Sequence, residues 1–276
     1  MPLTTTSAGL CSVSLRALPH GAVVTAAAAA GLAALEWGGD VHVPPGDTAT
    51  ARAVGAATRD AGLRVASYGS YHRALDPAAF DDVLAAAVAL GAPRIRVWAG
   101  RTASAQAGAE DRAQVARGVA DAVRRAGDAG VEIGLEWHGG TLTDTAASTA
   151  GLLAAVDDLV GAQTLTTYWQ PALDTGADEV LAGLAALADR VSTVHVFSWW
   201  PGTVRNTLAS REDLWERVFA LLGGTARDHD ALLEFLPGDD PDHLAGEART
   251  LLGWLSPRSP RHLHVRRPAV PPKPPG

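Results

Sequence analysis

The sequence predicts one closed (β/α)₈ TIM barrel over about residues 1–255. Short apolar runs rich in β-branched residues alternate with longer alanine-rich amphipathic stretches, and eight such units follow one another without a break in composition. Strands that alternate with helices imply a parallel sheet. The glycine-rich first turn of a doubly wound open sheet is missing, and a barrel needs roughly 250 residues, which this 276-residue chain can supply.

Several of the expected helices have recognisable start or stop signals in the sequence. Helix starts are indicated by Asp47-Thr48, Asp76-Pro77, Thr145 and Ser210. Helix ends are indicated by glycine at four places, namely Gly62, Gly91, Gly130 and Gly223-Gly224. The eight expected strands are Leu10–Arg16, Ala34–Trp37, Arg64–Tyr68, Arg94–Trp98, Glu132–Trp137, Thr164–Trp169, Thr193–Phe197 and Ala231–Phe235.

The composition excludes several classes of protein. The only lysine, Lys273, lies among prolines near the C-terminus, which excludes Schiff-base aldolases, pyridoxal-phosphate enzymes and P-loop nucleotidases, because each needs a lysine in a structured site. The formal charge is −7, and residues 256–276 carry five basic residues and no acid, so the barrel itself carries −12. Such a negative surface repels phosphate backbones, so we expect no nucleic-acid partner.

The chain shows no sign of a membrane or secreted location. Its longest apolar stretch, Ala22–Leu35, is shorter than the roughly 20 residues of a membrane span, and no basic residue precedes Arg16 to form a signal peptide. The single cysteine, Cys11, permits no internal disulfide. We therefore predict a cytoplasmic protein, compatible with a homo-oligomer, and a disordered proline- and arginine-rich tail over residues 256–276.

Polar residues that could carry chemistry lie at the C-terminal ends of the expected strands, where barrel active sites are found. Glu136 and Glu234 each follow an apolar strand and precede an aromatic residue. Two carboxylates in an apolar barrel mouth need a compensating cation. With His195 and the amide oxygen of Gln170 they form a donor set suited to one divalent metal ion, Mn²⁺, Mg²⁺, Co²⁺ or Zn²⁺.

Other strand-end residues are expected around the same mouth. His138 lies two residues beyond Glu136, so it faces the same way if the strand continues, and it is a second acid–base candidate. Tryptophans there can stack on a sugar ring. Arg96 lies inside a strand, where we expect a salt bridge. The further substrate-binding candidates are Glu36, His42, Tyr68, His72, Trp98, Arg101, Trp169 and Trp199.

From about residue 10 to 255 the sequence resembles the xylose isomerase-like sugar phosphate isomerase and epimerase family, also called the AP endonuclease 2 superfamily. The resemblance implies a metal held by Glu, Asp, His and Glu at the ends of strands five to eight, which match Glu136, Gln170, His195 and Glu234. This chain has Gln170 where the family has Asp, and Asp174 is the alternative ligand. Arg205 is the nearest counterpart of the family's substrate-gripping arginine.

The resemblance implies an isomerase or epimerase that acts on a sugar, sugar acid or cyclitol. Glu136 and Glu234 are expected to act as general base and acid beside a substrate carbonyl, while His195 remains a ligand. Two polar positions of ketose 3-epimerases are Leu142 and Leu173 here, which argues against a plain 3-epimerase. The endonuclease branch needs more histidine ligands and a basic surface, which this chain lacks.

Two alternative functions remain open at this point. A lyase, either a dehydratase or an enzyme that cleaves carbon-linked glycosides, would use the same metal and base to expel a β leaving group. A barrel that binds a sugar or a partner protein without catalysis is the other alternative, and Gln170 in place of an aspartate is its main support.

Overall fold

Eight parallel strands close into a barrel in the computed structural model, which describes residues 5–256. Around the barrel the order is β1, β2, β3, β4, β5, β6, β7 and β10, so β10 pairs with β1 and closes the sheet. The predicted TIM barrel is confirmed. The strands are β1 (Thr6–Cys11), β2 (Ala34–Gly38), β3 (Arg64–Gly69), β4 (Arg94–Val97), β5 (Glu132–Leu135), β6 (Thr166–Trp169), β7 (Val191–Val196) and β10 (His229–Leu233).

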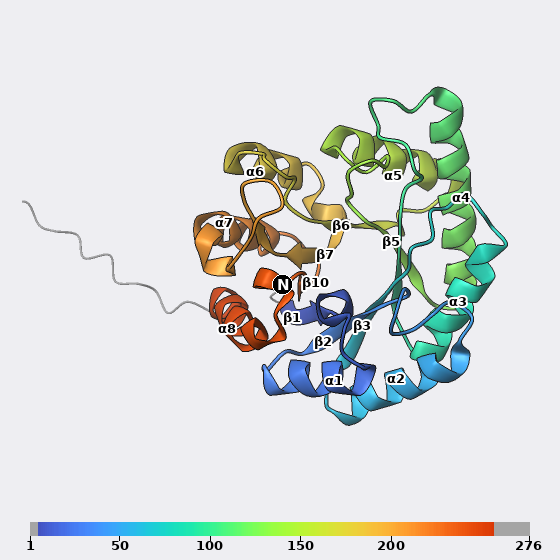
Figure 1. Cartoon of the computed structure of the whole chain (residues 1–276). Helices are drawn as coiled ribbons and strands as arrows, with labels where there is room; N and C mark the ends of the chain where they lie inside the picture. The colour runs from blue at the N-terminus through green and yellow to red at the C-terminus, as the bar shows by residue number, and fades with distance from the viewer. Residues whose placement is uncertain (1–4, 257–276) are drawn as a thin grey trace, which may run out of the picture.

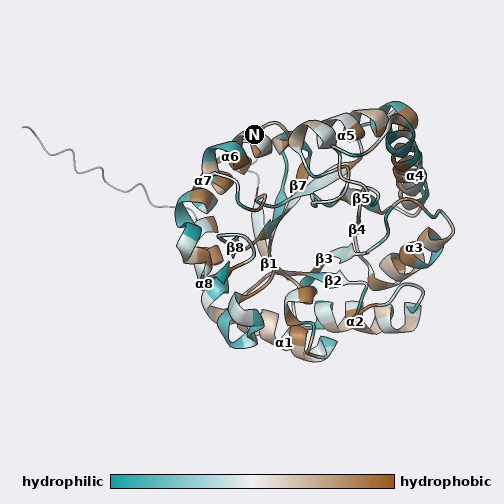
Figure 2. Ribbon diagram, turned by 45° about the horizontal axis from the view of Figure 1, so that its top comes forward, coloured by the Kyte–Doolittle hydropathy of each residue, from teal (hydrophilic) through white to brown (hydrophobic). Residues whose placement is uncertain are grey.

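Helices surround the strands in a single outer ring (Figures 1 and 2). None of the described helices is long and apolar enough to cross a membrane. The α-helices are α1 (His20–Ala29), α2 (Thr48–Asp60), α3 (Ala79–Leu90), α4 (Ala109–Asp128), α5 (Ala146–Val160), α6 (Ala177–Ala185), α7 (Glu212–Leu222) and α8 (Leu244–Leu255). A short hairpin of β8 (Ser198–Trp199) and β9 (Arg205–Asn206) follows β7.

Short 3₁₀ turns connect several of these elements. They are η1 (Ser12–Leu15), η2 (Ala188–Arg190), η3 (Leu208–Arg211), η4 (Pro237–Asp239) and η5 (Pro241–His243). The first turn accounts for the main difference from the expected strand boundaries.

The first strand begins and ends earlier than expected. It covers Thr6–Cys11 instead of Leu10–Arg16, because the chain turns into η1 after Cys11. Ser12 Oγ accepts a hydrogen bond from the backbone N–H of Gly38 at 2.9 Å, and Ser14 Oγ accepts one from Phe235 at 2.9 Å. The segment is thereby tied to the ends of β2 and β10.

Several helix signals read from the sequence are present as capping interactions. Asp47 accepts from the Thr50 N–H at 3.0 Å, and Thr145 accepts from the Ser148 N–H at 3.2 Å. Gly91 follows α3 with φ of 76°, a left-handed conformation that glycine adopts without strain. Gly223, by contrast, has φ of −63° and ends α7 without that turn.

The barrel interior contains two charged layers and a small apolar cluster. Near the N-terminal ends of the strands, Arg64 and Arg94 both pair with Asp230, and Arg94 also pairs with Glu132. A small apolar cluster of Cys11, Ala34, Ala66 and Leu232 lies on β1, β2, β3 and β10. The second charged layer, at the C-terminal ends, forms the floor of the candidate site.

Gly118 of α4 lies where the helix packs directly on backbone. A Cβ at this position would come 1.9 Å from the carbonyl oxygen of Ala74, whereas a Cβ at Gly127 of the same helix would meet nothing within 4 Å. We expect Gly118→Ala to lower the free energy of unfolding by about 1–3 kcal/mol through overpacking. Gly127→Ala is the matched control and should raise it by up to about 1 kcal/mol.

Urea denaturation of both variants measures the difference. Equal, stabilising effects of the two substitutions would contradict the close packing of α4 on Ala74.

Candidate active site

A cavity of about 500 Å³ opens at the C-terminal ends of the barrel strands. Its floor includes Arg96 from β4, Glu136 after β5, Gln170 after β6 and Glu234 after β10. Each of these side chains comes from the end of a different strand, as in barrel enzymes generally. A cavity of this size is typical of sites for small molecules.

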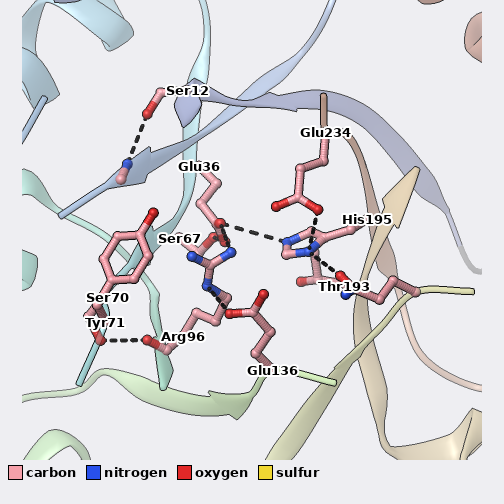
Figure 3. Close-up of polar contacts among 12 residues, drawn as sticks. Ser12, Glu36, Ser67, Ser70, Tyr71, Arg96, Glu136, Thr193, His195 and Glu234 are labelled. Carbon is pink, nitrogen blue, oxygen red and sulfur yellow. Dashed lines mark hydrogen bonds and ion pairs between the residues drawn. The ribbon is translucent and has the colours of Figure 1, made fainter. Parts of the chain in front are cut away.

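Arg96 forms the centre of a buried charge cluster (Figure 3). Its Nη1 lies 2.9 Å from Oε1 of Glu36, and its Nε lies 3.1 Å from Oε2 of Glu136. Neither nitrogen is aligned for a hydrogen bond, so these contacts are ion pairs between close charges. Arg96, Glu36 and Glu136 are each less than 5% exposed. The expected salt bridge of Arg96 therefore links two carboxylates from different strands.

Opposite charges in this cluster oppose the effect of burial on the pKa values of Glu36 and Arg96. Burial alone would raise the pKa of Glu36, but the Arg96 guanidinium, His195 and the Ser67 hydroxyl together lower that pKa to about 2. Burial would likewise lower the pKa of Arg96, yet Glu136, Glu36 and Glu234 raise it well above its ordinary value. Glu36 is thus ionised and Arg96 is its permanent counter-ion.

His195 lies on the other side of the cavity floor. Its Nδ1 is 3.1 Å from Oε1 of Gln170 and 3.3 Å from Oε2 of Glu234, while its Nε2 is 3.7 Å from Oε1 of Glu36. Burial lowers the pKa of His195, but Glu234 and Glu36 raise it above its ordinary value. Burial raises the pKa of Glu234, and His195 opposes this only in part.

Three of the four side chains expected to bind metal have a spacing that fits a cation. Ligands bonded at roughly 2.0–2.2 Å around one ion lie about 3 Å from one another, close to the two distances at His195 Nδ1. The fourth, Glu136, faces Arg96. The donors of Gln170, His195 and Glu234 therefore suit a divalent ion, and Glu136 is held beside them by the arginine.

Two further residues bear on this donor set. Asp174, the alternative to Gln170, accepts a hydrogen bond from the Gly202 N–H at 2.7 Å and does not line the cavity. Cys11, Glu234 and His195 place donor atoms within 4.8 Å of one another, the one such group of histidine, cysteine or acidic residues in the described part of the chain. Burial raises the pKa of the Cys11 thiol, so it is an additional neutral neighbour of the floor.

Aromatic side chains form two walls above the floor. On one side His138 stacks on Trp98 with ring centroids 4.0 Å apart, and Tyr71 lies 6.1 Å from Trp98. On the other side Trp199 contacts Phe197 at 5.1 Å and Phe235 at 4.9 Å. All six of these residues line the cavity.

An arginine supports each wall from outside the lining. The guanidinium of Arg73 lies 4.2 Å from the centre of the Trp98 ring, and that of Arg205 lies 5.1 Å from Trp199 and 4.7 Å from Phe235. Cation–π contacts of this kind hold rings in fixed positions. Arg205 also pairs with Asp239, so the structure places it behind a wall of the cavity.

The remaining substrate-binding candidates lie away from the cavity lining. Glu36 is buried beneath it on Arg96, and Arg101 lines a separate small pocket. The others are engaged in packing or local hydrogen bonds: His42 with Ser12 and Leu18, Tyr68 with the Val43 carbonyl, His72 against Phe80, and Trp169 against Trp215.

Several cavity residues were not singled out from the sequence. Phe197 lies two residues after His195, and Phe235 lies one residue after Glu234. An aromatic residue just after a strand end was therefore the signal that could have identified them. Val13 and Arg16 belong to the turn after β1, which was expected to be strand. Their places depend on where β1 ends.

Comparison with known proteins agrees with the barrel fold. A sequence model of the xylose isomerase-like TIM barrel matches residues 24–256. The chain belongs to this family. No curated protein matches this chain.

Solved structures of the same scaffold include a dehydratase and several epimerases. The probable 3-DHS dehydratase AsbF of petrobactin synthesis from Bacillus anthracis is 18% identical, with a TM-score of 0.71 over 90% of this chain and 98% of that one. A D-allulose 3-epimerase from Methylomonas sp. is 15% identical, with a TM-score of 0.66 over 92% and 99%. An L-ribulose 3-epimerase is 16% identical, with a TM-score of 0.65 over 91% and 94%. At these identities the likeness concerns the fold.

Proposed function

We propose that this family member is a metal-dependent isomerase or epimerase that acts on a sugar, sugar acid or cyclitol. One observation carries the proposal: two carboxylates, Glu136 and Glu234, enter the floor of one cavity from strands separated by β6 and β7. A base and an acid on different sides of a substrate carbon are what epimerisation requires. The epimerases of the same scaffold support this reading.

In this proposal several residues of the chain have separate roles in the reaction. Glu136 removes the proton from the carbon beside the substrate carbonyl, and the bonding electrons pass into the carbonyl to give an enediolate. Glu234, which enters the step with a proton on one carboxyl oxygen, gives that proton to the carbon from its own side, so that Glu136 ends the reaction protonated and Glu234 ionised. Gln170, His195 and Glu234 would hold the divalent ion, which when bound supplies a Lewis acid for the substrate oxygens. Arg96 holds Glu136 in position.

A lyase is the second candidate, supported by the dehydratase among the similar structures. It would share the first proton abstraction and then lose a β leaving group. Incubation with keto-sugars, sugar acids and cyclitols in D₂O, with Mn²⁺ present, distinguishes the two by NMR. Deuterium uptake at carbon without elimination identifies an isomerase or epimerase, and elimination identifies a lyase. If no compound of the panel shows deuterium uptake or elimination, the proposal that the protein is an enzyme of this kind is contradicted.

Gln170 is the residue expected to matter for metal binding. Gln170→Ala should weaken Mn²⁺ binding, measured by calorimetry, by roughly tenfold or more, because an oxygen donor next to His195 is lost. Asp174→Ala is the matched control and should leave the affinity unchanged, since Asp174 bonds Gly202. The reverse ranking of the two variants would make Asp174 the ligand.

A further inference from the structure

The upper cavity has a different chemical character from its floor. Ten of the eighteen lining residues have aliphatic side chains or are phenylalanine, tyrosine or tryptophan. Leu173 is the most exposed of these side chains, at 46%. Six of these ten side chains have no hydrogen-bonding atom, and those of Tyr71, Trp98, Trp137 and Trp199 carry one N–H or O–H group each, so the upper cavity offers few partners for sugar hydroxyls.

The cavity is also larger than a free sugar needs. A hexose takes up roughly 200 Å³ when close-packed, whereas the cavity measures about 500 Å³. A hexose bound to Glu136, Gln170 and Glu234 would therefore leave much of the space between the aromatic walls filled with water. Water against apolar walls is unfavourable relative to an apolar ligand group.

The rings of both walls contact neighbouring side chains that restrict their movement before a ligand enters. Trp98 packs against His138 and Arg73, and Trp199 packs against Phe235 and Arg205. Rings held in this way lose little conformational freedom when a ligand binds, so that more of the contact energy appears as affinity.

We propose that the substrate is a carbohydrate or polyol that carries an apolar, planar group of about the size of a phenyl ring. This inference rests on the proposed function, because it places the polyhydroxylated part on the carboxylate floor. The planar group then lies between the wall of Tyr71, Trp98 and His138 and the wall of Phe197, Trp199 and Phe235. Offset or edge contacts between aromatic rings stabilise such an arrangement.

Calorimetry with matched glycosides tests the proposal on the full chain. The probes are the methyl and phenyl β-glycosides of glucose, xylose and glucuronic acid. For each glycone that binds, the phenyl member should bind at least about tenfold more tightly, because burying part of the ring removes on the order of 60 Å² of apolar surface from water. Equal affinity of the methyl and phenyl members, or no binding of any phenyl member, overturns the proposal.

Two exposed apolar residues provide a matched pair of variants. Leu173, 46% exposed, lines the cavity, whereas Val204, 54% exposed, does not. Leu173→Ser should reduce the preference for phenyl over methyl severalfold, and Val204→Ser should leave it unchanged. A preference that survives in both variants, or falls equally in both, contradicts the placement of the planar group in the upper cavity, which Leu173 lines.

The result of this binding test can be distinguished from the result of the test of the proposed reaction. Phenyl glycosides that bind tightly, in a protein that exchanges no substrate proton with D₂O, would support this inference and refute the reaction. Rapid exchange with free sugars, without any preference for the phenyl members, would support the reaction and refute this inference.

Discussion

Replacing Glu136 by glutamine is expected to slow the exchange of the substrate's carbon-bound proton with solvent by about 10²- to 10⁴-fold, the usual contribution of a general base. Glutamine keeps the size of the side chain but cannot accept the proton. The carboxylate lies at the cavity floor, 3.1 Å from Arg96, so its position is fixed before substrate binds. Deuterium incorporation at a saturating concentration of a substrate found in the panel measures the effect.

Glu132→Gln is the matched control for this variant. Glu132 lies on the same strand, near its N-terminal end, with its side chain 53% exposed and paired with Arg94. The control should retain the exchange rate, and unfolding curves of both variants should show that each is folded. Full exchange in Glu136→Gln would refute the role of Glu136 as the base.

The second large effect is expected on stability. Arg96→Met should lower the free energy of unfolding by about 3–5 kcal/mol, because it removes the cation from a buried ion pair and leaves Glu36 and Glu136 uncompensated. Methionine is chosen to fill most of the volume. Urea denaturation monitored by circular dichroism measures the change.

Two further variants distinguish charge from packing as the cause. Arg117→Met removes one partner of an exposed pair with Glu110 and should have little effect. Combining Arg96→Met with Glu36→Gln should recover part of the lost stability, since one uncompensated charge is then absent. If the double variant is as unstable as the sum of the single ones, the pairing of Arg96 with Glu36 is not what stabilises the barrel.

Much of the fold could be predicted from local patterns. Alternating strand-like and helix-like segments, with caps such as Asp47 and Thr145, gave the right number and order of barrel units. The end of β1 could not be predicted in this way, because it depends on Ser12 and Ser14 bonding to the ends of β2 and β10. Those partners are distant in sequence.

The candidate site could likewise be predicted only in part from the sequence. The strand-end positions of Glu136, Gln170 and Glu234 were enough to expect them at one mouth, and all three line the cavity. Sequence position could not separate Trp98 and Trp199, which form its walls, from Trp169, which packs against Trp215. Whether a strand-end side chain turns into the barrel mouth or toward the helices depends on local register and on what packs behind it.

By itself the sequence determined the barrel, the absence of a structured lysine and the gathering of carboxylates, histidine and amide at the strand ends. Only the tertiary structure decided that Arg96 pairs with Glu36 and Glu136 while Gln170 and Glu234 meet at His195. The physical reason is that the periodicity of a strand determines which of its residues lie at the mouth of the barrel. Closure of the barrel then sets the distances between side chains from different strands, and those distances determine which side chains interact.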